Sequence, residues 1–277
     1  MRDGPAVPGA AREIRLGRAG TIARIAPDGY SAHGWVLELG GAEQSHVDLA
    51  DPRTLRHEYL RRIAAVLDTL GRPHRPLDVL HLGAGALTLP RYVQVTRPGS
   101  RQVVIEIERE LPGFVIDRLP LPAGTDLQVV IGDAREELAA MPGVLVDLMV
   151  LDVFTGEETP EHLACRDFYA EAIGHLAPGG ALLVNIGDDA GLRFFAREAQ
   201  ALEEAAAAAG VGGAWTLAEE HLLEQRLAGN LVLGAGDGLA GPEAPQRRAA
   251  WLAAGPHPAG VLDPDGTAHL VHRIQGG

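Results

Sequence analysis

Lysine is absent from this sequence of 277 residues, so all 24 basic side chains are arginines. This absence excludes enzymes that form a Schiff base through lysine and nucleotide-binding proteins that rely on a phosphate-loop lysine. Aromatic residues make up only 4% of the chain, and the formal net charge is −13. An acidic chain with few aromatic rings lacks the basic surface that nucleic-acid binding needs, so we expect no nucleic-acid partner.

Cysteine occurs once, at Cys165, which excludes an internal disulfide framework and any metal site built from several cysteines. The 11 histidines show no metal-ligand spacing, so we expect no metal cofactor. A single cysteine is compatible with a reducing compartment, and we expect a cytoplasmic location. No segment approaches the roughly 20 consecutive apolar residues of a transmembrane helix. Residues 1–20 also lack the apolar core of a signal peptide, so we expect no membrane partner.

The hydrophobic content of 46% is sufficient for a folded core. Residues 1–20 are expected to form a leader that need not be ordered. Short alternating segments broken at glycine and proline predict a small antiparallel β-hairpin unit over residues 21–50. Apolar residues at helical spacing then predict a helix over 51–71, with Asp51 as its N-cap and Pro52 in its first turn.

Strands alternate with helices through the middle of the chain. Six short apolar runs predict strands, at 77–83, 101–108, 126–134, 146–154, 180–187 and 230–236. Helical patterns separate them, which is typical of a mostly parallel sheet covered on both faces. We therefore predict an α/β fold with a doubly wound, Rossmann-like sheet over 51–235. Residues 236–277 form a C-terminal extension, expected to hold one short helix and a final strand over 266–274.

Four strand ends carry residues suited to a nucleoside ligand: Gly83 with Gly85, Glu106, Asp133 with Ala134, and Asp152. In doubly wound sheets, ligands bind beyond the carboxyl ends of the strands. Glycines let the backbone approach a ligand closely, and a carboxylate after the second strand can accept hydrogen bonds from both ribose hydroxyls. Each feature alone also fits a tight turn or a helix N-cap. Thr88 replaces the third glycine of a dinucleotide fingerprint, which favours an adenosyl ligand over NAD.

These residues lie in four blocks that resemble the spermidine synthase (polyamine aminopropyltransferase) family, from about residue 35 to 234. The blocks are LELGGAEQS, RHEYLRRI, VLHLGAGALTLPRYV and DVFTGEETPEHLACRDFY. The resemblance implies a methyltransferase-type fold that binds decarboxylated S-adenosylmethionine or S-adenosylmethionine. It places Glu106 on the ribose, Asp133 on the adenine amine, and Gln44 and His57 in the hairpin and helix motifs. It also implies a homodimer.

Three positions depart from the family pattern. Ala86 stands where the family has an aspartate that holds the aminopropyl amine, Thr155 replaces the second aspartate of the catalytic loop, and Arg56 replaces a tyrosine. A protonated diamine needs carboxylates in place of its lost hydration, so we expect putrescine to be a poor acceptor.

The predicted activity is aminopropyl transfer to a small-molecule amine, with Asp152 as base and amine-orienting group. His57, Thr155 and Glu157 are candidate acceptor-binding residues, and Gln44 is a candidate contact to the donor. Surface or loop-capping roles remain the alternative for each of these residues. Two other functions stay open. One is methyl transfer, with Arg91 or the amides near Gly83 holding the donor carboxylate. The other is a non-catalytic module that binds nucleosides.

Overall fold

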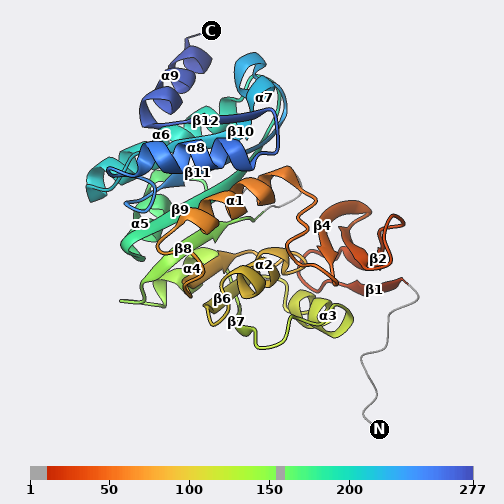
Figure 1. The fold of residues 1–277 in the computed structure, drawn as a ribbon. Coiled ribbons are helices and arrows are strands. Elements are labelled where there is room, and N and C mark those ends of the chain that lie inside the picture. The colour runs from red at the N-terminus through yellow and green to blue at the C-terminus, as the bar shows by residue number, and fades with distance from the viewer. Residues whose placement is uncertain (1–10, 154–159, 277) are drawn as a thin grey trace.

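The computed structural model describes residues 11–153 and 160–276, in which a large sheet and a small sheet are present (Figure 1). The large sheet has eight strands in the order β12-β10-β11-β9-β8-β5-β6-β7. Its strands are β5 (Asp78–Leu82), β6 (Arg101–Glu106), β7 (Asp126–Ile131), β8 (Val146–Leu151), β9 (Leu176–Asp188), β10 (Trp215–Glu219), β11 (Gly229–Ala235) and β12 (Ala259–Leu262). The helices are α1 (Glu58–Thr69), α2 (Thr88–Thr96), α3 (Leu111–Arg118), α4 (Ala134–Ala139), α5 (Arg166–Gly174), α6 (Arg193–Ala209), α7 (Glu220–Gln225), α8 (Ala244–Ala254) and α9 (Pro264–Gln275).

Strands β5 to β9 run parallel, and the strand order reverses between β5 and β8. The prediction of a doubly wound, mostly parallel sheet is therefore confirmed. Both faces of the sheet are buried. Leu80 and Leu82 belong to the core that includes α4, α5, α6, α7 and α9, whereas Val79, which precedes Leu80, belongs to the core with α1, α2 and α8. This alternation follows from the two-residue period of a strand and explains why the parallel strands are almost continuously apolar.

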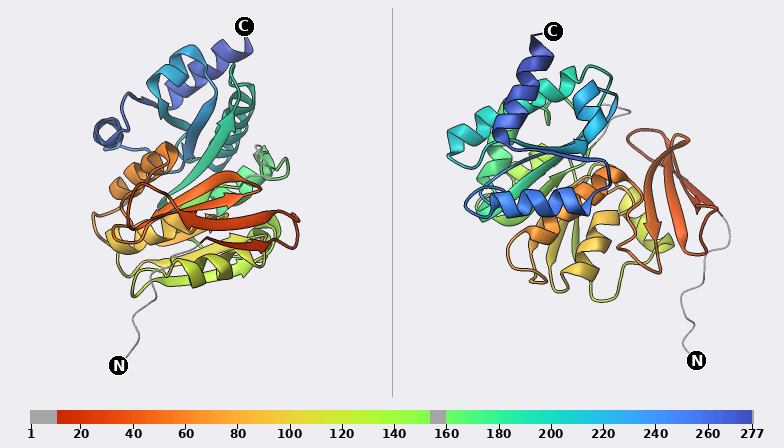
Figure 2. Two further views of the ribbon diagram at one scale, coloured as in Figure 1. Left: turned by 90° about the vertical axis from the view of Figure 1, so that its right-hand side faces the viewer. Right: turned by 45° about the horizontal axis from the view of Figure 1, so that its top comes forward.

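The small sheet consists of β1 (Arg12–Arg15), β2 (Ile22–Pro27), β3 (Gly34–Leu39) and β4 (Ala42–Asp48), each antiparallel to the next. It stands beside the end of the large sheet that carries α3 (Figures 1 and 2). Trp35 and Leu37 pack there in one core cluster with Leu111 and Val115 of α3. Strand β1 falls within the segment expected to be a leader. The ordered hairpin unit thus begins earlier than predicted, because residues 12–15 pair with β2.

The first helix begins seven residues later than predicted. Asp51 does not cap α1, because it lies in a separate turn. Its carboxylate accepts a hydrogen bond from the Arg53 backbone N–H at 3.1 Å and one from Arg53 Nε at 2.8 Å. The Thr54 N–H donates to the Asp51 carbonyl oxygen. His57 occupies the N-cap position of α1 instead, without a side-chain capping bond.

The last third of the chain, including the C-terminal extension, is more regular than predicted. Strands β10 and β12 pair with each other and were missed, and β10 also pairs with β11. The strand predicted over 266–274 is wrong, because these residues belong to α9. Asp263 caps this helix by accepting the Gly266 N–H at 2.9 Å, and Thr267, Leu270, Val271 and Ile274 are buried at helical spacing.

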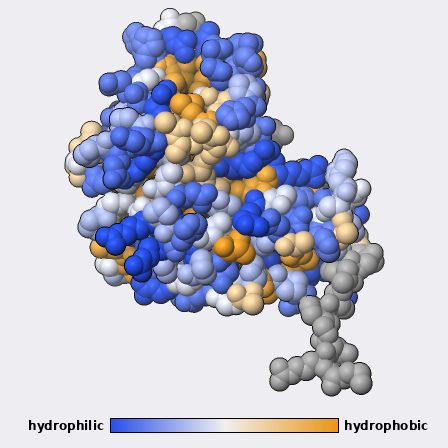
Figure 3. All heavy atoms as spheres, viewed as in Figure 1, coloured by the Kyte–Doolittle hydropathy of each residue, from blue (hydrophilic) through white to orange (hydrophobic). Residues whose placement is uncertain are grey.

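The face of the molecule in Figure 3 is mostly hydrophilic, with separate apolar patches. Within the described residues, no helix is both long and apolar enough to span a bilayer.

Candidate functional site

A cavity of about 860 Å³ opens at the carboxyl ends of β5 to β9. This volume lies within the range of small-molecule sites. The cavity brings together the following predicted site residues: Gln44, His57, Gly83, Gly85, Glu106, Asp133, Ala134 and Asp152. Thr155 and Glu157 lie outside the described residues. The small sheet contributes β4 to one wall, and α1 contributes its first turn.

The glycine pair allows a backbone path that other residues would block. Gly83 has φ +98°, and a Cβ built on it would lie 2.3 Å from the Asp152 carbonyl oxygen. Gly85 has φ +47°, and its Cβ would lie 2.7 Å from Ser45 Oγ. The loop therefore runs against the end of β8 on one side and β4 on the other.

Glu106 is fixed by the backbone around it. Its side chain is 8% exposed, and its two oxygens accept the N–H groups of Ala84 at 2.9 Å and Glu108 at 2.8 Å. Burial raises the pKa of this carboxyl above its usual range, although the backbone donors partly oppose the rise. Each carboxylate oxygen has a second lone pair. Glu106 is thus an oriented acceptor that can meet two adjacent hydroxyl groups.

The turn between β1 and β2 is attached to the same side of the cavity. Glu108 accepts the backbone N–H groups of Ala19 at 2.6 Å and Arg18 at 3.1 Å. Both of these residues and Glu108 itself line the cavity. These hydrogen bonds hold the small sheet against the end of β6, so that it forms part of the wall beside Glu106.

Asp133 combines a capping role with a place in the cavity wall. Its Oδ1 accepts the N–H groups of Arg135 and Glu136 at the start of α4, as the N-cap alternative predicted. Its Oδ2 lies 2.8 Å from Nε2 of His162, which also lines the cavity. Burial pushes the pKa of Asp133 upward, but the His162 and backbone hydrogen bonds outweigh it and lower the pKa. Ala134 begins α4 directly behind this carboxylate.

Asp152 is held by two neutral side chains. Its Oδ1 accepts a hydrogen bond from Asn185 Nδ2 at 2.8 Å, and its Oδ2 accepts one from the Tyr59 hydroxyl at 3.0 Å. Desolvation raises the pKa of the carboxyl, while these two hydrogen bonds act in the opposite direction. A partly desolvated carboxylate with raised pKa is better able to accept a proton than one in water.

His57 lies at the N-cap of α1, where its Nε2 is 3.8 Å from Glu43 Oε1. Burial lowers the pKa of this histidine, with Glu43 acting in the opposite direction. Its ring centroid lies 6.0 Å from that of Tyr59. The hairpin and the first turn of α1 thus meet at the cavity.

One sequence-based assignment changes with the structure. Arg91 was a candidate for holding a donor carboxylate, but its guanidinium is buried and donates to the carbonyl oxygens of Ala86, Leu119 and Pro120. It does not line the cavity. Ala86 is 1% exposed and packs in the core beneath the small sheet. The position therefore presents no charged group to the cavity.

Sequence reasoning missed several polar residues of the cavity wall, among them Tyr59, His81, His162, Asn185 and Asn230. A signal for two of them is present in the sequence. His81 and Asn185 interrupt runs that are otherwise almost wholly apolar, and a buried polar side chain is costly unless it has partners. Within residues 11–153 and 160–276, no group of three or more His, Cys, Asp or Glu side chains could hold a metal ion.

His81 is a buried neutral histidine. It is 3% exposed, and its Nε2 lies 3.0 Å from Gln102 Oε1, while Gln102 donates to the Pro90 carbonyl oxygen. Burial lowers the pKa of His81 from 6.5 to about 4. The unfolded chain therefore binds a proton at this site at pH values where the folded chain does not.

The free energy of unfolding is expected to fall as the pH drops from 6.5 to about 4. The stability that neutral His81 contributes is fully present above the pKa of this histidine in the unfolded chain. It is lost as the pH falls toward the pKa in the folded chain, and the loss amounts to at most about 3 kcal/mol. Urea denaturation of His81→Gln should show a smaller pH dependence in this window than the unaltered chain. Equal slopes for the two proteins would contradict this role of His81.

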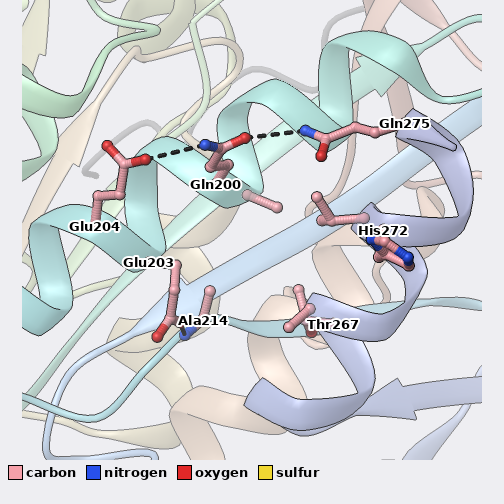
Figure 4. A pocket seen from close by; sticks show the side chains of 10 residues that line it. Gln200, Glu203, Glu204, Ala214, Thr267, His272 and Gln275 are labelled. Carbon is pink, nitrogen blue, oxygen red and sulfur yellow. Dashed lines mark hydrogen bonds between the residues drawn. The ribbon is translucent and has the colours of Figure 1, made fainter.

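A second, smaller hollow of about 230 Å³ lies between α6 and α9 (Figure 4). Its polar side chains pair with one another. Gln200 donates to Glu204 at 3.0 Å, and Gln275 donates to Gln200 at 2.9 Å. None of the predicted site residues lines it. The large cavity is therefore the candidate site.

The curated proteins that match the sequence are of one kind. No protein-family model matches the sequence. A polyamine aminopropyltransferase of Vibrio vulnificus (strain CMCP6) is 30% identical over 139 residues, which cover 49% of this chain and 46% of that protein. The chain thus spans about half the length of the curated relatives that it matches.

Solved structures match over much more of the chain. A probable spermidine synthase from Corynebacterium glutamicum ATCC 13032 superimposes with a TM-score of 0.82 and 26% identity, covering 95% of this chain and 94% of that one. A spermidine synthase in complex with the transition-state analogue AdoDATO superimposes with a TM-score of 0.59 over 96% of this chain and 87% of that chain, at 14% identity. The latter likeness concerns the fold alone.

Proposed function

We propose that this chain, a divergent member of the spermidine synthase family, binds an adenosyl donor and transfers an aminopropyl group to a small amine. The observation that carries the proposal is the cavity at the carboxyl ends of the strands. It contains a fixed carboxylate suited to ribose hydroxyls, Glu106, and a partly desolvated carboxylate, Asp152. The glycine loop 83–85 follows β5, between the strands that carry these two side chains in the sheet.

The nucleoside end fits the residues present. Glu106 keeps acceptor capacity on both oxygens after its two backbone bonds, which suits vicinal ribose hydroxyls. Asp133 Oδ2, paired with His162, is available to an adenine amine at the start of α4. Gln44 and the tight loop at Gly83 and Gly85 complete this part of the cavity. A structure of the same fold holds the adenosyl analogue AdoDATO, which supports an adenosyl ligand here.

The reacting end requires an amine to attack the carbon next to the donor sulfonium. The new C–N bond forms as the C–S bond breaks, its electron pair stays on sulfur, and methylthioadenosine leaves. Asp152 would orient the attacking amine and accept the proton that it loses. Tyr59 and Asn185 each donate to one carboxylate oxygen, which leaves the remaining lone pairs for the amine.

The acceptor is proposed to be an amine other than putrescine. Thr155 replaces the second aspartate of the family's catalytic loop, and Arg56 replaces the tyrosine of the helix motif. A protonated diamine would therefore lose hydration with one carboxylate fewer to compensate for it. Both donors stay in the proposal. Arg91 is engaged by three carbonyl oxygens and does not reach the cavity, which disfavours the carboxylate of S-adenosylmethionine. Ala86 replaces the family's aspartate for the aminopropyl amine, which removes a contact to the decarboxylated donor.

Calorimetric titration of the purified chain with decarboxylated S-adenosylmethionine, S-adenosylmethionine and methylthioadenosine tests the donor site. Mass spectrometry of an amine panel incubated with the chain and each donor then tests the chemistry. We expect binding and an aminopropyl gain on at least one amine. A methyl gain would support methyl transfer, and binding without any product would support a non-catalytic module. Absence of binding to all three nucleosides would refute the adenosyl assignment.

Glu106→Ala is expected to weaken the affinity for methylthioadenosine by about 1–3 kcal/mol, because the ribose hydroxyls would lose their acceptor. Glu108→Ala is the matched control. Glu108 also lines the cavity, but its carboxylate holds the turn between β1 and β2 through the Arg18 and Ala19 N–H groups and is assigned no ribose contact, so we expect a smaller loss. Calorimetry measures both affinities. Equal losses in the two variants would mean that Glu106 has no specific ribose contact.

A further inference from the structure

Asn185 is a buried amide in an otherwise apolar stretch of β9. It is 2% exposed, and Leu182, Leu183, Val184 and Ile186 around it are buried aliphatic residues. An apolar side chain at this position would avoid the desolvation cost of the amide. Among the described residues, the amide hydrogen bonds to two cavity-lining side chains, Asp152 on one side and Asn230 on the other. The polar contacts of Asn185 are therefore with the cavity wall.

We infer that Asn185 is a positioning residue for Asp152, and that Asn230 fixes the orientation in which Asn185 acts. Asn230 Nδ2 donates to Asn185 Oδ1 at 3.1 Å, and Asn185 Nδ2 donates to Asp152 Oδ1 at 2.8 Å. This inference rests on the proposed function, because it assigns Asp152 the role of orienting the amine.

The sheet register brings the two asparagines together. Strands β9 and β11 are antiparallel, with Val232 opposite Asn185 and Asn230 opposite Gly187. Asn230 and Asn185 are therefore diagonal neighbours on one face of the sheet, within reach of each other. Asp152 follows β8, which is the other neighbour of β9. Three adjacent strands thus align a chain of hydrogen bonds that ends on the carboxylate.

The direction of these hydrogen bonds matters. An asparagine side chain can rotate by half a turn, exchanging its donor and acceptor atoms. If Asn185 rotated, its carbonyl oxygen would face the Asp152 carboxylate, and two acceptors would meet. The donor on Asn230 favours the orientation that turns Asn185 Nδ2 toward Asp152. Tyr59 holds the other carboxylate oxygen, so both oxygens are fixed before any amine binds.

The test compares Asn185→Leu, Asn230→Leu and the double variant with the unaltered chain. Leucine has a similar size but has no donor. The first readout is the ¹³C signal of the Asp152 carboxyl carbon as a function of pH, assigned by its loss in Asp152→Asn. We expect the pKa of Asp152 to rise in Asn185→Leu and to rise less in Asn230→Leu. In the double variant, Asn230→Leu should add nothing, because its effect passes through Asn185.

The second readout is turnover. In Asn185→Leu we expect kcat to fall about tenfold and the acidic limb of the pH profile to move to higher pH, because the charged carboxylate loses a donor. The affinity for methylthioadenosine should not change. The other titratable side chains that line the cavity stay intact in all variants: Arg18, Glu43, His57, Tyr59, His81, Glu106, Glu108, Asp133 and His162.

Thr216→Val is the control for general loosening of the sheet. Thr216 is buried and hydrogen-bonds to Thr267 at 2.9 Å, away from the cavity lining. This variant should leave the Asp152 titration unchanged.

An unchanged Asp152 titration in Asn185→Leu, or additive effects of Asn185→Leu and Asn230→Leu, would overturn the inference. If Asn185→Leu does not fold, the Asp152 titration in Asn230→Leu decides the inference, because Asn230 is exposed and its substitution leaves the core intact. Lack of turnover in the unaltered chain would refute the proposed function, while the carboxyl titration would still decide this inference.

Discussion

Asp152→Asn is expected to reduce aminopropyl transfer by about 10²–10⁴-fold while leaving the affinity for methylthioadenosine nearly unchanged. Asparagine has almost the same shape, but it cannot take a proton from the attacking amine. Its amide would also place a donor against either the Tyr59 hydroxyl or the Asn185 amide, which both donate to Asp152 in the native chain. Product formation under single-turnover conditions measures the loss, and calorimetry measures the nucleoside affinity.

Asp126→Asn is the matched control for this change. Asp126 is exposed at the first position of β7, at the end of the sheet opposite the cavity. The control removes one negative charge without touching the cavity wall, and it should keep full activity. Equal losses in the two variants would point to net charge as the cause. Retention of activity in Asp152→Asn would show that Asp152 is not the base of the reaction.

Gly83→Ala is expected to abolish measurable nucleoside binding and to destabilise the fold by about 2–5 kcal/mol. The new Cβ would lie 2.3 Å from the Asp152 carbonyl oxygen, which belongs to backbone and cannot rotate away. The positive φ of +98° adds strain. Moving the loop to relieve the contact would displace the Ala84 N–H from Glu106 and the end of β8 from β5. Urea denaturation and calorimetric titration measure the two effects.

Gly113→Ala is the control for this glycine. Gly113 lies inside α3, and a Cβ built on it meets nothing within 4 Å. Alanine should be neutral or stabilise the chain there, because it has the higher helix propensity. If Gly83→Ala bound nucleoside as tightly as Gly113→Ala, the loop would not form the close approach that the site requires.

The central strands and the place of the site follow from the sequence because the signals are local. Each parallel strand is a short apolar run that ends in glycine or an acidic residue, and parallel strands bring their carboxyl ends to one edge. Gly83, Glu106, Asp133 and Asp152 therefore meet in one cavity without any knowledge of side-chain contacts. Their individual roles in binding or catalysis remain predictions.

The errors occur where the structure depends on distant partners. Strands β10 and β12 are antiparallel and form the outer part of the sheet, and β12 has only four residues, so pairing defines them more than sequence pattern does. Residues 266–274 alternate enough to suggest a strand, yet the Asp263 cap and the packing against α6 select a helix. The error at Asp51 has a local cause instead: it has the residue type of an N-cap, but the neighbouring Arg53 engages its carboxylate within a separate turn.

The polar partners of the site could not be predicted for a related reason. Tyr59, Asn185 and Asn230 come from α1, β9 and β11, and only the folded register brings them to Asp152. Arg91 matched a family motif in sequence, but burial directs its guanidinium to the carbonyl oxygens after α3. A sequence match specifies the residue type and leaves open what the side chain contacts.

The most direct measurement is release of methylthioadenosine from decarboxylated S-adenosylmethionine by the purified chain, with and without an amine panel. The account predicts release that depends on an amine, matched by an equal amount of aminopropylated product, and abolished in Asp152→Asn. Nucleoside binding with no amine-dependent release for any acceptor would contradict it.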